Sequence, residues 1–107
     1  MNVTFRQLRL FLALAETGSV SAAAKLMHVT QPTASMQLRE VALSVGVPLY
    51  EVVARRVRLT DAGRELAQTA RAMVGEWEGF GQRMAAMKGL VRGRLGGWAA
   101  AAMAFTA

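Results

Sequence analysis

The sequence predicts a mainly α-helical protein, with three short helices, a short β-hairpin and then one long helix. Between residues 5 and 45, apolar side chains recur at steps of three and four between cap residues, which is the pattern of amphipathic helices. Residues 49–53 and 56–59 are β-prone runs separated by Ala54 and Arg55, which predicts a hairpin. From residue 66 an apolar heptad repeat continues for more than three heptads, which predicts a helix that pairs with another.

Charge and composition narrow the classes of partner and site. The chain has 107 residues, enough for one domain with a modest core and one extended element. It carries 13 Lys and Arg against 7 Asp and Glu, and the net charge of +6 favours an anionic partner, either nucleic acid or a membrane surface. With no Cys and one His, the sequence excludes disulfides and thiolate metal sites and argues against a zinc site, so no cofactor is expected.

Other classes of protein are disfavoured by what the sequence lacks. The N-terminus has no signal-peptide layout, and no apolar run approaches the ~20 residues that span a bilayer, so a cytoplasmic protein with no membrane partner is expected. An enzyme needs a nucleophile, a base or a metal cluster in a pocket. One His and seven scattered acids offer none at useful spacing, so we expect no enzymatic activity.

The first two helices are predicted from cap residues and apolar spacing. Thr4 and Gln7 form a capping box, and Gly18 is expected to end the first helix. Ser19 then caps a second, short helix. The first helix is expected to bury Phe5, Leu8, Leu12 and Ala15, and the second Val20, Ala23, Ala24 and Met27.

The third helix is the most informative segment. Thr30 is expected to cap it, with Pro32 in its first turn, and two helices joined by about three residues make a helix-turn-helix. Its outward face is expected to be small, polar and basic near the N-terminus, where a recognition helix meets base edges in the major groove. The same pattern also fits the solvated face of an ordinary bundle helix. The inward residues are Ala34, Leu38, Val41 and Val45, and the outward ones Pro32, Ser35, Met36, Arg39 and Leu43.

The predicted hairpin has a basic tip. Arg55, Arg56 and Arg58 fall within four residues of sequence, which also fits a solvated loop. Beside a helix-turn-helix, they are better interpreted as a wing that reaches phosphates or the minor groove.

Residues 5–66 resemble the LysR-type transcriptional regulators nearly throughout. The segments FRQLRLFLALAETGSVSAAAKLMHVTQPTAS, GVPLYE and RRVRLTDAGREL occur in the order and spacing of that family. The resemblance implies a winged helix-turn-helix, a linker helix that pairs with that of a second subunit, and a small-molecule effector domain that follows in a longer, full-length protein. It also implies that Gln31, Pro32, Thr33 and Ser35 contact bases and phosphates, and that Arg55 and Arg56 belong to the wing.

Three positions depart from the family pattern. Met36 stands where the family often has Arg, and it cannot make the bidentate guanine contact of an Arg. Ala42 replaces a usual Glu and Val52 a usual Arg. The segment QPTASMQ is similar to that of regulators of carbon-fixation operons. We include Met36 and Arg39 with the expected DNA-contacting residues.

The long helix is expected to begin at Thr60 and Asp61 and to carry the heptad seam. The alternative is that the stripe packs on the protein's own core, but the short helices cannot cover ~40 Å of it. Three glycines outside the seam weaken the helix, so it should depend on a partner helix. The seam comprises Leu66, Ala70, Met73, Trp77, Phe80, Met84, Met87 and Val91, and the centre of the dimer interface is expected at Met73, Trp77, Phe80 and Met84.

These expectations divide the chain into three parts. Residues 1–59 form the DNA-binding domain, 60–90 the dimerisation helix, and 91–107 a tail at the place where the family's effector domain begins, which fits a truncated strand or an extended helix. The expected partner is duplex DNA with a pseudo-palindromic operator, bound by a homodimer. A helical module that binds proteins or membranes is the alternative, although the seam lacks the Lys-rich opposite face of an interfacial helix.

Overall fold

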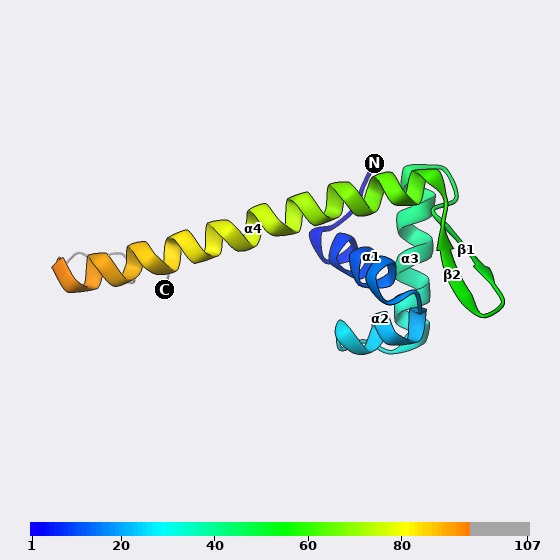
Figure 1. The fold of residues 1–107 in the computed structure, drawn as a ribbon, viewed down its shortest axis with the longest axis horizontal. Helices are drawn as coiled ribbons and strands as arrows, with labels where there is room; N and C mark the ends of the chain where they lie inside the picture. The colour runs from blue at the N-terminus through cyan, green and yellow to red at the C-terminus, as the bar shows by residue number, and fades with distance from the viewer. Residues whose placement is uncertain (95–107) are drawn as a thin grey trace. The chain divides into compact units, whose positions relative to one another are not determined.

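The computed structural model describes residues 1–94 and has the mainly helical architecture that the sequence predicts (Figure 1). The chain divides into two units, Met1–Val74 and Gly75–Ala107. No helix among the described residues is long and apolar enough to cross a membrane. Most of the predicted tail, residues 95–107, lies outside the described residues. In order, the elements are α1 (Phe5–Thr17), α2 (Val20–Leu26), α3 (Gln31–Val45), β1 (Tyr50–Val53), β2 (Arg56–Leu59) and α4 (Asp61–Arg94).

The three short helices pack on one another around an apolar core. α1 contacts both α2 and α3, and α2 also contacts α3. The largest fully buried side chains are Phe11, Leu14, Leu38, Val41 and Leu49. Leu49 lies in the segment between α3 and β1, so this connection closes the core beside the helices.

The buried face of α1 differs from the predicted one. Of the expected stripe, Leu8 is buried, whereas Phe5, Leu12 and Ala15 are only partly buried. Because α1 contacts both α2 and α3, its buried face is wider than a stripe for one neighbour. The side chains of α1 that face the core cluster are Leu10, Phe11, Ala13 and Leu14.

The helix-turn-helix has the predicted caps. The Ser19 hydroxyl accepts a hydrogen bond from the Ala22 amide, and the Thr30 hydroxyl accepts one from the Thr33 amide. His28, in the turn between α2 and α3, has a φ of 57°, in the left-handed region. In α3 the predicted inward residues Ala34, Leu38 and Val41 are buried, and Val45 is partly buried against the same cluster.

The hairpin is a regular antiparallel pair. Tyr50 pairs with Leu59 and Val53 with Arg56, so Ala54 and Arg55 form a two-residue turn. Both turn residues have positive φ, 51° and 64°, as a type I′ turn requires. The sequence predicts the first strand from Leu49, but the strand begins at Tyr50, because Leu49 packs in the apolar core.

The start of α4 is tied to the chain before the hairpin. The Thr60 hydroxyl accepts a hydrogen bond from the Gly63 amide at 3.0 Å and donates one to the Pro48 carbonyl at 2.8 Å. The Thr60 amide donates to the Leu49 carbonyl at 3.1 Å. A Cβ atom at Gly63 would lie 1.9 Å from that carbonyl oxygen, so only glycine allows this close approach.

The apolar seam of α4 has two environments. In its first turns Leu66 packs partly buried against the core cluster and Ala70 is buried, as the own-core alternative allows. Further along the seam Met73, Trp77, Phe80 and Met87 are exposed and Met84 is partly buried. Trp77 and Phe80 stack with ring centroids 5.7 Å apart. α4 continues to Arg94, four residues beyond the predicted end at residue 90.

Candidate nucleic-acid interface

The first turns of α3 present an exposed polar surface. The Thr30 cap and the buried Ala34 and Leu38 set the rotation of the helix, so its opposite side lies in solvent. Thr33 is half-buried, and its hydroxyl accepts a hydrogen bond from that of Thr30 at 2.9 Å. The remaining residues expected to contact DNA on this helix are all exposed, namely Gln31, Pro32, Ser35, Met36 and Arg39.

The tip of the hairpin is basic and open. Arg55, Arg56 and Arg58 are exposed, and within residues 1–94 none of the three forms an ion pair. Because the chain reverses at Ala54 and Arg55, the side chains of Arg55 and Arg56 lie at the end of the hairpin. The strand that carries Arg56 and Arg58 is fixed to the helices by the Val57 amide, which donates a hydrogen bond to the Gly18 carbonyl at 3.2 Å. The structure therefore holds a basic wing on the same compact unit as α3.

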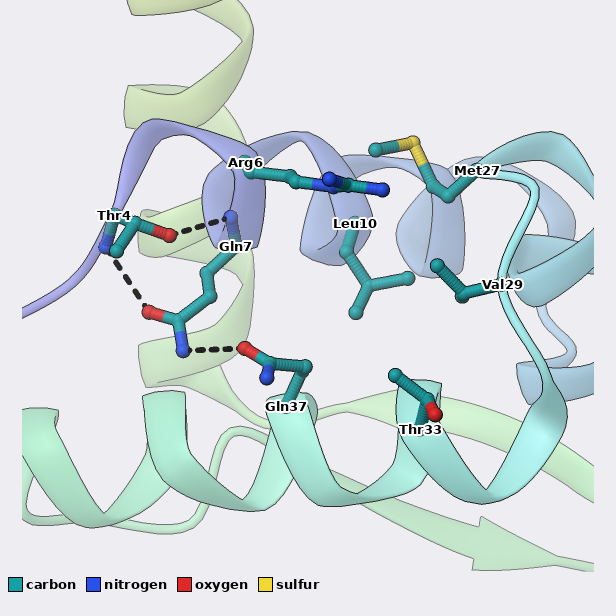
Figure 2. A pocket seen from close by; sticks show the side chains of 8 residues that line it. All are labelled: Thr4, Arg6, Gln7, Leu10, Met27, Val29, Thr33 and Gln37. Atoms are coloured by element: carbon teal, nitrogen blue, oxygen red, sulfur yellow. Dashed lines mark hydrogen bonds between the residues drawn. The ribbon is translucent and has the colours of Figure 1, made fainter.

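A crevice of about 270 Å³ is lined by residues of α1, of the turn between α2 and α3, and of α3 (Figure 2). The Arg6 side chain extends along α1 over Leu10 toward Met27, with Thr33 and Gln37 of α3 below it. Arg6 is exposed and makes no ion pair among the described residues. It therefore adds a positive charge beside the first turns of α3.

Gln7 makes hydrogen bonds beyond the predicted capping box. Its Oε1 accepts the Thr4 amide at 3.0 Å, as the capping box predicts. Its Nε2 also donates to Gln37 Oε1 at 2.7 Å (Figure 2). The same Nε2 donates to Glu40 Oε2 at 3.1 Å. Gln7 thereby positions α3 against α1. The capping motif identifies Gln7, but a contact with residues 30 and 33 positions away has no signal in a single sequence.

Met73, Trp77, Phe80 and Met84 occupy one face of α4. Trp77 is 59% exposed and Phe80 43% exposed, while Met84 is partly buried. Large apolar side chains so exposed are typical of an interaction surface. Met73 belongs to the unit that carries α3, whereas Trp77, Phe80 and Met84 belong to the second unit.

Comparison with known proteins identifies the family. Residues 5–64 match the family described as "Bacterial regulatory helix-turn-helix protein, lysR family". This chain belongs to the LysR family. The match covers the three short helices, the hairpin and the start of α4, which is the segment on which the sequence resemblance rests.

Similar proteins include a transcriptional activator and a RuBisCO operon transcriptional regulator. The transcriptional activator CmpR of Synechocystis sp. is 35% identical over 94 residues, 88% of this chain and 31% of CmpR. A RuBisCO operon transcriptional regulator of Allochromatium vinosum is 38% identical over 95 residues, 89% of this chain and 32% of that protein. The chain thus spans about a third of the length of these relatives. The resemblance of QPTASMQ to carbon-fixation regulators is consistent with these matches.

Solved LysR-family structures share the fold. The DNA complex of the CbnR DNA-binding domain has a TM-score of 0.72 and 38% identity, and covers 79% of this chain and 98% of that one. DarR of Vibrio fischeri, also in complex with DNA, has a TM-score of 0.74 and 33% identity, and covers 84% of this chain and 31% of that one. The compact unit is accordingly a LysR-type winged helix-turn-helix DNA-binding domain.

The three departures from the LysR pattern fall in different environments. Met36 is exposed on the outward side of α3, and Val52 is exposed in β1 on the wing. Ala42 is partly buried against the core cluster, so its small size matches its surroundings. Two of the three departures therefore change the surface that faces away from the core.

Proposed function

We propose that this chain binds duplex DNA sequence-specifically as a homodimer and forms the DNA-binding part of a transcriptional activator or repressor. In this proposal the first turns of α3 enter the major groove. Gln31, Ser35 and Met36 then reach base edges. The observation that carries the proposal is the exposed polar face of α3 on a compact unit whose hairpin tip carries exposed arginines that form no ion pair within residues 1–94. The other proposed contacts are made by Pro32, Thr33 and Arg39. Those at the edges of the α3 surface would contact the phosphate backbone of the DNA.

The wing supplies sequence-independent affinity. Arg55 and Arg56 would neutralise phosphates or enter the minor groove beside the site read by α3. Their support is geometric, because the Val57 to Gly18 hydrogen bond fixes the wing to the turn before α2. The net charge of +6 acts in the same direction.

The dimer would form through the exposed seam of α4. Met73, Trp77 and Phe80 are exposed in the single chain, and aromatic side chains contribute strongly when they are buried at an interface. A two-fold protein would match a pseudo-palindromic operator with half-sites one helical turn of DNA apart, or a multiple of it. The helix from residue 60 is therefore proposed as the dimerisation element.

The charges that flank the seam favour antiparallel pairing. In the heptad that places Trp77 and Phe80 at the core positions, Glu76 and Arg83 are both g residues, and Lys88 is an e residue. Parallel helices would place Arg83 against Lys88 of the partner helix, which is repulsive. Antiparallel helices would place Glu76 against Arg83 of the partner helix twice, by symmetry. The same arrangement stacks Trp77 opposite Phe80 at the centre.

The remaining parts of the proposal concern the whole protein. The relatives of this chain are transcriptional regulators. We therefore propose that it acts by binding rather than by catalysis, in the cytoplasm where bacterial DNA lies. Any small-molecule effector would be bound by a longer form of the protein, beyond the compact unit described above.

Selection of bound sequences from a random duplex pool tests the proposal. The expected result is an enriched motif with two-fold symmetry, from which half-site spacing and base preference are read together. Recovery of unenriched DNA by the folded protein would contradict sequence-specific binding. A single, unrepeated half-site would contradict the dimeric arrangement.

A further inference from the structure

Met36 is an apolar side chain on the surface that the proposed function directs toward bases. It lies in the second turn of α3, is 52% exposed, and does not belong to the apolar core cluster. The buried residues Ala34, Leu38 and Val41 lie on the opposite side of the helix, so the core does not account for a methionine at this position. Pro32, one turn earlier, and Arg39, just under one turn later, are exposed on the same side.

The chemistry of the first two turns of α3 restricts what they can read. Residues 31–38 contain no Lys or Arg, so none of them can make the bidentate contact with guanine O6 and N7. The thioether of Met36 donates no hydrogen bond and is at most a weak acceptor. Among the groups on the major-groove edges of the four base pairs, the C5 methyl of thymine is the only apolar one.

We propose that Met36 contacts the C5 methyl group of one thymine in each half-site and is a specificity-determining residue. The inference rests on the proposed function, because it requires α3 to lie in the major groove. Contact with the methyl removes apolar surface of both groups from water, which favours thymine over cytosine and over uracil at that position. A flexible, unbranched side chain adapts to the methyl without a fixed hydrogen-bond geometry.

The test replaces thymine by deoxyuridine, which removes the methyl and keeps the base pair. In the operator obtained by selection, each thymine pair related by the two-fold axis is replaced in turn, and affinity is measured by fluorescence anisotropy. Loss of about 0.8 kcal/mol per methyl corresponds to about fourfold per half-site, or about 15-fold for the symmetric pair. Wild-type protein should lose this affinity at one thymine pair, and Met36→Ala should bind the thymine and deoxyuridine sites equally.

Leu43→Ala is the matched control. Leu43 is also an exposed apolar residue on the outward side of α3, but it lies two turns further from the helix N-terminus. This variant should retain the wild-type discrimination between thymine and deoxyuridine. Because both side chains are exposed, both variants should fold like the wild type, and thermal melts check this.

Two results would overturn the inference while leaving DNA binding intact. One is a flat deoxyuridine scan with wild-type protein on a selected operator. The other is a scan in which Met36→Ala loses as much affinity as wild type at the same thymine. If selection enriches no site, the proposed function fails first and this inference fails with it.

Discussion

The Val57 amide donates a hydrogen bond to the Gly18 carbonyl at 3.2 Å, and this contact joins the wing to the end of α1. Gly18 has a φ of 71° and ends α1 in the left-handed conformation, which turns its carbonyl out of the helix. Gly18 therefore both ends α1 and accepts a hydrogen bond from β2. Because the same turn leads into α2, the wing and the helix-turn-helix share one point of attachment.

The basic wing should determine part of the salt dependence of DNA binding. Each neutralised phosphate adds about 0.9 to the magnitude of the slope of log K against log salt, so Arg55→Ala with Arg56→Ala should flatten the slope by roughly one to two units. Titrations at four salt concentrations measure it. Arg71→Ala, which removes an exposed charge from α4, serves as the control and should leave the slope near its wild-type value. A double wing variant with the wild-type slope would remove the wing from the interface.

Glycines in α4 should respond in opposite directions to alanine. At Gly63 a Cβ would lie 1.9 Å from the Leu49 carbonyl oxygen, so Gly63→Ala must displace the backbone and should destabilise the domain by about 1–3 kcal/mol. At Gly75 nothing lies within 4 Å of the added Cβ, so Gly75→Ala should stabilise the helix by up to about 1 kcal/mol. Urea unfolding of the two variants measures both effects. Equal changes would show that the two sites do not differ in packing.

Gln7 should matter more than its capping role. Thr4→Ala removes the hydroxyl arm of the capping box and should cost about 1 kcal/mol. Gln7→Ala removes the other arm and also its hydrogen bonds to Gln37 and Glu40, which should bring the cost to about 2–3 kcal/mol. Denaturant unfolding compares the variants. If Gln7→Ala costs no more than Thr4→Ala, the bonds between α1 and α3 contribute nothing to stability.

Local chemistry accounts for what was predictable from the sequence. Thr4, Ser19 and Thr30 each accept a hydrogen bond from the amide three residues later, so their caps can be identified without knowledge of the fold. The face of α1 could not be predicted correctly, because it depends on two neighbouring helices. Similarly, the close approach of the Gly63 backbone to the Leu49 carbonyl, fourteen residues away, could not be predicted from the spacing of apolar residues.

The candidate site divides in the same way. The outward position of Met36 follows from helical periodicity once Leu38 and Val41 are assigned to the core. The burial of Ala70 in α4 could not be predicted in this way. An apolar seam has the same sequence pattern whether it packs against its own domain or against a second copy of the chain. Only the exposure of Met73, Trp77 and Phe80 in the structure separates the two environments.

The orientation of the paired helices can be tested by one substitution with opposite expected signs. If the helices are antiparallel, Arg83→Glu places two Glu pairs across the interface and should weaken the dimer several-fold, given about 0.2–1 kcal/mol for each exposed pair. If they are parallel, the new Glu faces Lys88 of the partner helix and should strengthen it. Sedimentation equilibrium at low salt measures the dissociation constant. Adding Glu76→Arg to Arg83→Glu should restore the wild-type value only in the antiparallel arrangement.

The last prediction concerns the seam itself. Trp77 and Phe80 stack on each other and are 59% and 43% exposed, so a second helix can cover both at once. Replacing both by Asp puts two charges on each helix into one interface, and burial of unpaired charge costs several kcal/mol. The variant should be monomeric at micromolar concentration, where the wild type is a dimer.

Gln82→Asp with Ala85→Asp is the matched control for the seam variant, because both residues are exposed and lie outside the heptad core positions. It introduces the same charges and should remain dimeric. A seam variant that still dimerises, or a monomeric wild type, would exclude this face of α4 as the interface. Loss of the dimer should also uncouple the two half-sites, since linked contacts act at a high effective concentration. The seam variant should then bind a full operator hardly better than a half-site, although α3 and the wing are unchanged.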